Sequence, residues 1–261
     1  MTHPAAKHLK EIRNERFYRV FDDWLELMIA AHTRDEDNYM KTMRRYGPRE
    51  TGKEHPADHF KAAIWAVMAE MQRDNEKGDL RDHLGEIYEQ EAAQNTEMGQ
   101  FFTPMSVCKV MTAMTIGDGL PDKEHVNIND PACGSGRLLL AAMPHFKLGQ
   151  ATYYGTDLDR TCAMMAAMNM LWRNADSYIV WGNSLTVEAR GGWMTEFTGL
   201  GGRIRAMTQE QAQSVIEIGL RGAAEEPQHV LGTPEKKEEI QKVAEEIKIR
   251  ENKRGQFEME L

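Results

Sequence analysis

Asn-Asp-Pro-Ala-Cys-Gly-Ser-Gly occupies residues 129–136, between an apolar-alternating run that ends at Ile128 and an apolar run at 138–142. This order predicts a strand, a glycine turn and a helix. Gly134 and Gly136 let the backbone approach a ligand where a Cβ would clash, and the following helix offers free N–H groups and a positive dipole end. A tight connection in any α/β domain has the same pattern, so the turn by itself only indicates a polar ligand.

Two further strand patterns follow the turn. Residues 151–157 form an apolar run that ends in Asp157, and residues 177–184 form another with a polar end. An acid about 20 residues beyond the glycine turn is where Rossmann-like folds place the carboxylate that binds a ribose. Between these strands, residues 158–174 predict a helix rich in methionine, which we interpret as core filling. The pattern is typical of an α/β fold.

Two motifs together resemble a known family. Asp-Pro-Ala-Cys-Gly-Ser-Gly at 130–136, preceded by Gly-Gln-Phe-Phe-Thr-Pro at 99–104, resembles the S-adenosylmethionine (SAM) site of adenine-N6 DNA methyltransferases. The likeness is greatest to the modification (M) subunit of type I restriction systems and extends from about residue 82 to 185, with 82–89 similar to the helix before the second motif. It implies a SAM-dependent methyltransferase Rossmann-like sheet, preceded by a helical region, and SAM as the cofactor.

The resemblance also implies the residues that contact the cofactor. They are Phe101, Phe102, Thr103, Pro104, Asp130, Ala132, Gly134, Gly136, Asp157, Leu158 and Asn183.

Physical roles can be assigned to several of these residues. An aromatic ring covers the apolar parts of the ligand, while the Thr103 hydroxyl binds its charged end. Gly136 and its neighbours allow close approach to the methionine part, Asp157 accepts from the ribose hydroxyls, and Leu158 contacts the adenine ring. Asn183 stands where the family usually has an aspartate that accepts from the adenine amine, and its amide can accept as well as donate.

The sequence departs from the family where the chemistry is done. The family uses an Asn- or Asp-Pro-Pro-Tyr or -Phe tetrapeptide at the end of the fourth strand, which binds the target amine and stacks on a flipped base. No Pro-Pro occurs in this sequence, and residues 186–213 lack an apolar run for that strand. We expect a loop at 191–202, with Trp193 and Phe197 stacking on a base or anchoring the loop. The sheet is therefore predicted to be incomplete on its C-terminal side, and no catalytic residue is assigned.

The flanking regions are predicted to be helical. We divide the chain into a helical N-terminal region (1–95), a SAM-binding Rossmann-like domain (96–220) and a charged C-terminal helix or tail (221–261). Apolar residues recur at helical intervals in 11–31 and 58–73, with a helix start at 55–58. A helix is expected over 80–94 and another over 107–116. Residues 214–220 predict a strand or a short helix, and Ile240, Val243 and Ile247 lie among alternating Glu and Lys in an expected exposed helix.

Composition restricts the partners and the compartment. The apolar content of 41% is enough for a core, whereas the net charge of −9 is the wrong sign for holding DNA by the overall field. DNA contacts would need a partner or a local patch, such as the basic cluster Lys41, Arg44, Arg45, Arg49 and Lys53.

Cysteine usage and hydropathy narrow the setting further. Three cysteines without paired spacing argue against a disulfide frame or a metal site. Cys133 in the glycine turn is interpreted as a packing residue and not as a nucleophile. The lack of a long apolar run or a signal-peptide pattern predicts a cytoplasmic protein without a membrane segment.

Three functions stay open at this point. The first is a SAM-binding DNA adenine-N6 methyltransferase-like protein whose methyl transfer to DNA needs a partner subunit, a second copy or the 191–202 segment. The second is a catalytically inactive homologue that acts as a DNA- or protein-binding regulator or as a restriction antagonist. The third is methylation of a substrate other than DNA, because SAM motifs do not report the target.

Overall fold

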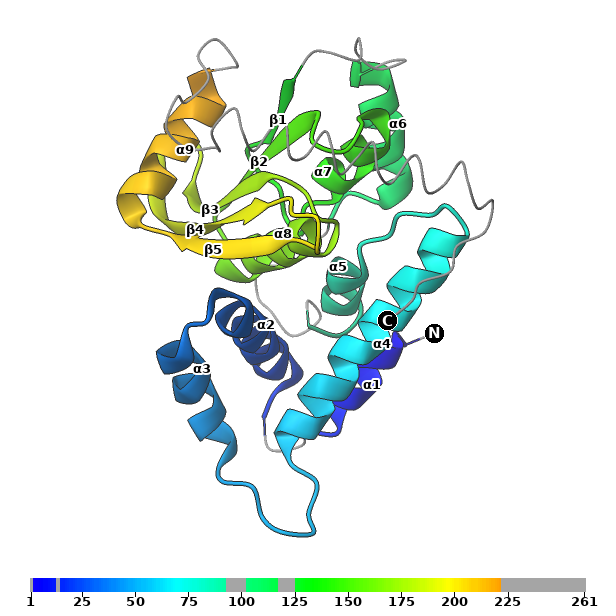
Figure 1. Ribbon diagram of the computed structural model, residues 1–261, viewed down its shortest axis with the longest axis vertical. Helices are drawn as coiled ribbons and strands as arrows, with labels where there is room; N and C mark the ends of the chain where they lie inside the picture. Colours follow the sequence, from blue (N-terminus) through cyan, green and yellow to red (C-terminus); the bar gives the residue numbers. More distant parts are fainter. Residues whose placement is uncertain (1, 13–14, 93–101, 117–124, 222–261) are drawn as a thin grey trace.

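Three parallel strands form one side of a five-stranded twisted sheet (Figure 1). The computed structural model describes residues 2–12, 15–92, 102–116 and 125–221. The strands are β1 (Val126–Asp130), β2 (Ala151–Asp157) and β3 (Ser177–Asn183). The connections contain α7 (Arg137–Ala142), followed by the short helix η4 (Met143–His145), and α8 (Arg160–Trp172). The predicted strand–turn–helix order is confirmed.

An antiparallel hairpin extends the sheet beyond β3, where we expected a loop at 191–202. It consists of β4 (Glu188–Glu196) and β5 (Arg203–Met207), and the strand order is β1-β2-β3-β4-β5. The loop prediction was wrong for residues 191–196, because glycine here allows close strand pairing, whereas residues 197–202 do form the loop of the hairpin. A Cβ on Gly192 would stand 2.3 Å from the backbone oxygen of Ile179. Trp193 and Phe197 are buried, so they anchor this segment in the core.

Both faces of the sheet are covered by helices. On one face, Tyr153, Ile179 and Trp193 pack with the methionine-rich helix α8 in the main core. The opposite face packs against α9 (Gln209–Arg221), which supplies Val215 and Ile216 to a second cluster. The methionines Met164, Met165, Met168 and Met170 of α8 are fully buried, which confirms core filling. The segment 214–220 is therefore helical.

The N-terminal region is helical, as predicted. It contains α1 (Pro4–Lys10), α2 (Phe17–Thr33), α3 (Glu36–Met43), the 3-10 turn η1 (Arg44–Tyr46) and α4 (Pro56–Glu76). The predicted 80–94 helix begins at His83 as α5 (His83–Ile87) and continues as the π-helical segment η2 (Tyr88–Ala92), and α6 (Met105–Ile116) precedes the sheet. The predicted 80–94 helix thus starts three residues later than expected, because the Asp82 side chain caps α5.

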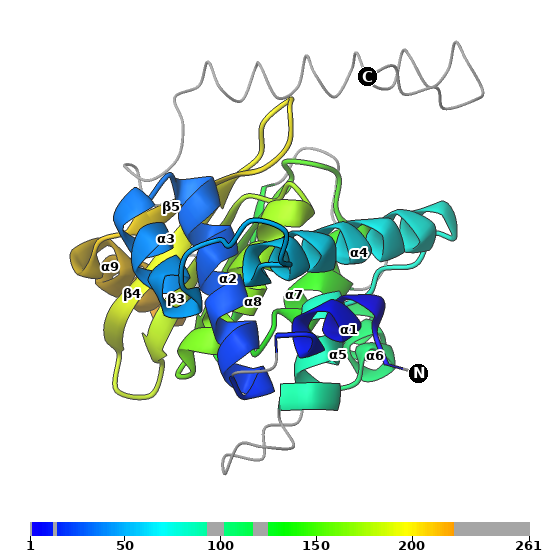
Figure 2. The same cartoon turned by 90° about the horizontal axis from the view of Figure 1, so that it is seen from below.

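The helical region and the sheet share one hydrophobic core. Figure 2 shows α2 lying beside α8. The Phe21 ring of α2 lies 5.9 Å from the ring of Tyr88. The indole N–H of Trp24 donates to the Phe60 carbonyl of α4 at 3.1 Å. The boundary that we place at residue 95 stays a prediction, and most of the predicted tail (221–261) lies outside the described residues.

The start of α4 is built as the sequence predicts. His55 caps the helix, and Asp58 accepts from the His55 amide at 3.1 Å, which completes a capping box. Asp58 also pairs with Arg49 at 2.7 Å, and Lys53 pairs with Glu50. Together with an Arg45–Asp23 ion pair, these contacts neutralise much of the basic cluster that we considered for phosphate binding.

No helix within the described ranges is long and apolar enough to cross a membrane.

Candidate functional site

The carboxyl ends of the three parallel strands meet at one edge of the sheet. Asp130, Asp157 and Asn183 are the last residues of β1, β2 and β3. Ligands of open α/β sheets bind in the crevice outside this edge. The strands therefore bring three of the predicted site residues to the place where a ligand is expected.

The glycine turn and the acid of β2 are directly bonded. The Gly134 N–H donates to Asp157 Oδ2 at 2.8 Å, and the Asp159 N–H donates to Oδ1 at 2.9 Å. Gly134 has a φ of +54°, which favours glycine. Burial is the main cause that raises the pKa of the Asp157 carboxyl, and burial likewise raises the pKa of Asp130. Two carboxylate oxygens offer about four acceptor positions, so Asp157 can still accept from a ligand hydroxyl group.

Phe102 lies directly on this turn. A Cβ on Gly134 would stand 2.8 Å from Phe102 Cδ1, so glycine is needed here to admit the ring. The Phe102 N–H donates to Glu89 Oε1 at 3.0 Å, and the Arg137 guanidinium lies 5.2 Å from the ring centroid. The two motifs quoted from the sequence are thereby packed together into one site.

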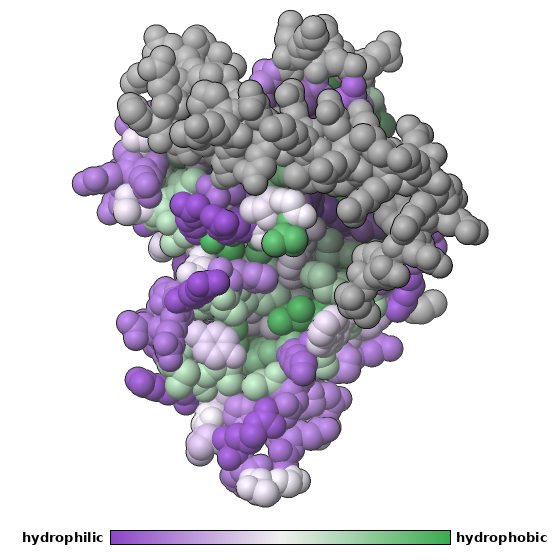
Figure 3. Space-filling model, in the orientation of Figure 1, coloured by the Kyte–Doolittle hydropathy of each residue, from purple (hydrophilic) through white to green (hydrophobic). Residues whose placement is uncertain are grey.

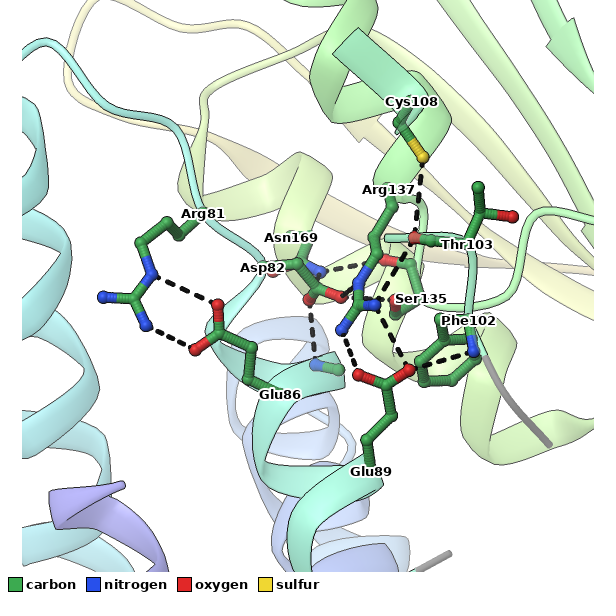
Figure 4. Close-up of polar contacts among 11 residues, drawn as sticks. Arg81, Asp82, Glu86, Glu89, Phe102, Thr103, Cys108, Ser135, Arg137 and Asn169 are labelled. Atoms are coloured by element: carbon green, nitrogen blue, oxygen red, sulfur yellow. Dashed lines mark hydrogen bonds and ion pairs between the residues drawn. The ribbon is translucent and has the colours of Figure 1, made fainter. Parts of the chain in front are cut away.

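A buried polar network centred on Asp82 holds the glycine turn through Ser135 and Arg137 (Figure 4). Asp82 accepts from Ser135 Oγ at 2.5 Å, from Arg137 Nε at 2.8 Å and from Asn169 Nδ2 at 2.8 Å. Arg137 also pairs with Glu89 at 2.7 Å. Because an unpaired buried charge is costly, these contacts hold the glycine turn, α5 and α8 in a single arrangement.

Sequence reasoning did not find this network. Its members are Asp82, Glu89, Ser135, Arg137 and Asn169. One signal was available, since Arg137 is the one charged residue at the start of an otherwise apolar helical segment, and Asp82 and Glu89 are seven residues apart. A buried charge of this kind calls for an opposite charge from elsewhere in the chain.

The other predicted cofactor residues have different surroundings. Thr103, Pro104, Ala132 and Leu158 are exposed, and Phe101 lies outside the described residues.

Gly136 is buried against α8. Its added Cβ would stand 3.3 Å from Ala166 Cβ, so a glycine here allows the turn to pack closely on α8, and the approach to a ligand stays a prediction. The Asn183 side-chain oxygen accepts from the Leu185 and Thr186 amides at 2.9 and 3.4 Å, where it holds the β3–β4 turn. Both of its lone pairs are thus engaged, which leaves the amide N–H₂ group for a ligand.

Cys133 is a packing residue. Its N–H donates to the Thr156 carbonyl at 2.9 Å, and its sulfur lies 3.0 Å from the position of a Cβ on Gly155. In the described ranges, no group of three or more His, Cys, Asp or Glu side chains is arranged to hold a metal ion.

We expect the thiols of the native protein to be unreactive. Cys108, Cys133 and Cys162 are buried, and burial raises the pKa of each thiol, so little reactive thiolate forms. Ellman's reagent should modify none of them on the time scale of free cysteine, and all three in urea. Rapid native labelling that disappears in Cys133→Ala would contradict this assignment.

The N-6 DNA Methylase family model matches residues 79–198, which contain the glycine turn, Asp157 and the supporting network. This segment is similar to the N-6 DNA methylase family. The recognition made from the two motifs is thus confirmed.

Two curated relatives of this N-6 DNA methylase segment are methylase subunits of type I restriction enzymes. The MpnII methylase subunit of Mycoplasma pneumoniae is 33% identical over 103 residues, which cover 38% of this chain and 18% of that protein. The MjaIX methylase subunit of Methanocaldococcus jannaschii is 24% identical over 179 residues, which cover 65% of this chain and 27% of that protein. The chain thus spans about a fifth to a quarter of the length of these relatives.

A solved structure is also similar to this chain. It is the type I restriction-modification methyltransferase subunit of Streptococcus thermophilus, with 22% identity, a TM-score of 0.31, and coverage of 64% of this chain and 39% of that one. With so low a TM-score the likeness adds nothing to the fold, which the strand order itself defines.

Proposed function

We propose that this chain binds SAM at the carboxyl edge of β1, β2 and β3, as an N-6 DNA methylase-like protein. The supporting observation is that Gly134, Asp157 and Phe102, which come from three separate segments, meet at this edge with a hydrogen bond and ring contact. A carboxylate, a backbone turn and an aromatic ring are the groups that an adenosyl amino acid requires.

Each group has a role toward SAM. Asp157 accepts from the ribose hydroxyls, exposed Leu158 covers the adenine ring, and the Asn183 amide donates to an adenine ring nitrogen. Phe102 and the exposed Thr103–Pro104 pair border the methionine part. When bound, SAM supplies a methyl group on a sulfonium, and the residues of this chain position that group.

Methyl transfer to DNA is proposed to need a partner. The chain lacks the Pro-Pro tetrapeptide, and among the described strands none pairs with the outer edge of β1. In the classic doubly wound order, the fourth strand occupies that edge. The groups that hold the target base would therefore come from outside these 261 residues, for example from a partner subunit or a second copy.

The same observations favour a second function. Without the acceptor and the stacking aromatic, neither base extrusion nor amine positioning is provided. A SAM-binding but inactive homologue that regulates by binding DNA or protein, or that antagonises restriction, is the alternative proposal.

Calorimetric titration with SAM tests the common part of both proposals. Saturable binding supports them, and no heat at millimolar SAM removes both. Methyl-labelled SAM and unmethylated DNA then separate the two. Incorporation by the purified chain, alone or with candidate partner subunits, and absent from a Gly134→Ala control, supports the enzyme, whereas SAM binding without incorporation under either condition supports the inactive homologue.

SAM affinity is expected to fall as the pH is lowered. Burial raises the pKa of Asp157, and ribose hydroxyls donate to its ionised form. Binding is therefore strongest above this raised pKa and weakens by about tenfold per pH unit below it. The folding stability of the ligand-free protein has the opposite pH dependence. Burying the Asp157 charge costs free energy only when the group is ionised, so this cost grows as the pH rises toward the raised pKa and is complete above it.

Titrations at several pH values measure this effect. Asp157→Asn should weaken binding at neutral pH and flatten the pH profile, whereas Asp22→Asn on α2, a carboxyl outside the site whose pKa burial also raises, should keep the slope. A wild-type slope in Asp157→Asn would show that Asp157 does not hold the ribose.

A further inference from the structure

The helix α6 exposes an apolar stripe. Val107, Val110, Met111 and Met114 are 44%, 58%, 47% and 82% exposed and lie at i, i+3, i+4 and i+7 on one face. The opposite face packs on α7, where Thr112 Oγ1 donates to the Ala141 carbonyl at 3.3 Å. A contiguous exposed apolar stripe on a helix is typical of a surface that another element covers.

The apolar stripe of α6 carries no charged side chain. Lys109 is the only charged residue of α6, and it pairs with Asp79 at 2.8 Å. The stripe therefore suits another apolar surface and does not suit nucleic acid.

The C-terminal end of α9 lies beside β1, the strand nearest to α6 and α7. The last turn of α9 is tied to β1, because Asn129 Nδ2 donates to the Gly219 carbonyl at 2.8 Å. In Figure 1, β1 lies between α9 and α6, and α7 packs against both β1 and α6. The described part of the chain thus ends, at Arg221, close to β1. The 19 residues from Arg221 to Ile240 span up to about 60 Å when extended, which is ample to reach α6.

The sequence of that segment matches the stripe. Ile240, Val243 and Ile247 recur at i, i+3 and i+7, between Glu and Lys residues that would stay in water. Two helical stripes of this spacing pack against each other by ridges and grooves.

We propose that residues 234–250 fold back as an amphipathic helix and cover the α6 stripe with Ile240, Val243 and Ile247. A tether raises the effective concentration of this segment to the millimolar range, whereas a second copy carries the same charge of −9 and is repelled. The tail is thereby assigned a role in completing the open side of the sheet domain, whether or not SAM binds.

Methionine oxidation tests this in the full chain. Brief exposure to hydrogen peroxide, followed by mass spectrometry, reports how accessible the Met111 and Met114 thioethers are. Val243→Asp should speed their oxidation by about tenfold, which corresponds to a docking free energy of about 1.4 kcal/mol. Gln241→Asp adds the same charge on the other side of the segment and should leave the rate at the wild-type value.

A second variant checks the contact from the other side. Met114→Asp should raise the amide hydrogen exchange of residues 240–247, while an unchanged melting temperature shows that the core is intact. Equal oxidation of Met111 and Met114 in the wild type and Val243→Asp would overturn the proposal. Protection that grows with protein concentration would overturn it in favour of a second copy.

Oxidation of Met40 on α3 reports whether the C-terminal segment docks at a different surface. It is 46% exposed, and its neighbours Tyr39 and Met43 line a pocket of about 170 Å³ between α2, α3 and α4. Figure 3 shows apolar residues on this side of the helical region. If Val243→Asp accelerates oxidation of Met40 but not of Met114, the tail lies over that pocket and the proposal is wrong.

Discussion

Asp82→Ala is expected to lower the free energy of unfolding by about 3–5 kcal/mol, the cost of removing one partner from a buried ion pair. Asp82 is almost fully buried, and its carboxylate accepts from Ser135, Arg137, Asn169 and the Gly85 amide. Alanine leaves these donors without their acceptor and removes the cap of α5. We therefore expect a variant that is largely unfolded near body temperature.

Urea denaturation followed by circular dichroism measures this loss. Asp79→Ala is the matched control, because Asp79 pairs with exposed Lys109 and should cost less than about 1 kcal/mol. Asp82→Asn keeps the shape and part of the acceptor capacity, so its loss should lie between the two. Equal stability of Asp82→Ala and Asp79→Ala would show that the network does not hold the turn.

Gly134→Ala is expected to weaken SAM binding by about 100-fold or more, which corresponds to about 2.7 kcal/mol. The φ of +54° strains any residue with a Cβ, and the added methyl would stand 2.8 Å from Phe102 Cδ1. Phe102 cannot move freely, because its amide is bonded to Glu89 and its ring lies beside Arg137. The turn must therefore shift, and with it the amide that orients Asp157.

Gly78→Ala separates backbone strain from this site. Gly78 has a similar φ of +66°, but nothing lies within 4 Å of its added Cβ, and it precedes α5. It should lose about 1 kcal/mol of stability and keep wild-type SAM affinity in calorimetric titration. Similar losses of affinity in both variants would mean that general destabilisation, and not the turn, governs binding.

The local elements were predictable from the sequence because their signals lie in contiguous residues. Alternating apolar residues predicted β1, β2 and β3, and the glycines between β1 and α7 predicted the turn. The helix start at 55–58 and the methionine core of α8 were also confirmed, although the sequence did not single out His55 as the cap. The two motifs were enough for the family.

Pairing across the chain was not predictable in this way. The strand β4 was interpreted as a loop because Gly191 and Gly192 lower strand propensity, yet pairing with β3 and β5 overrides it. Gly136 was assigned to ligand approach, but its surroundings on α8 become visible only in three dimensions. The Asp82–Arg137 pair joins residues 55 positions apart.

The sequence by itself determined the strand–turn–helix unit, the acid that follows it and the family, since these depend on the order of neighbouring residues. Only the tertiary structure decided that Phe102 lies on Gly134, that β4 is a strand and that a buried charge network supports the turn. The physical reason is that a strand or a buried charge is stable only with a partner, and the partner is chosen by packing over long separations in the chain.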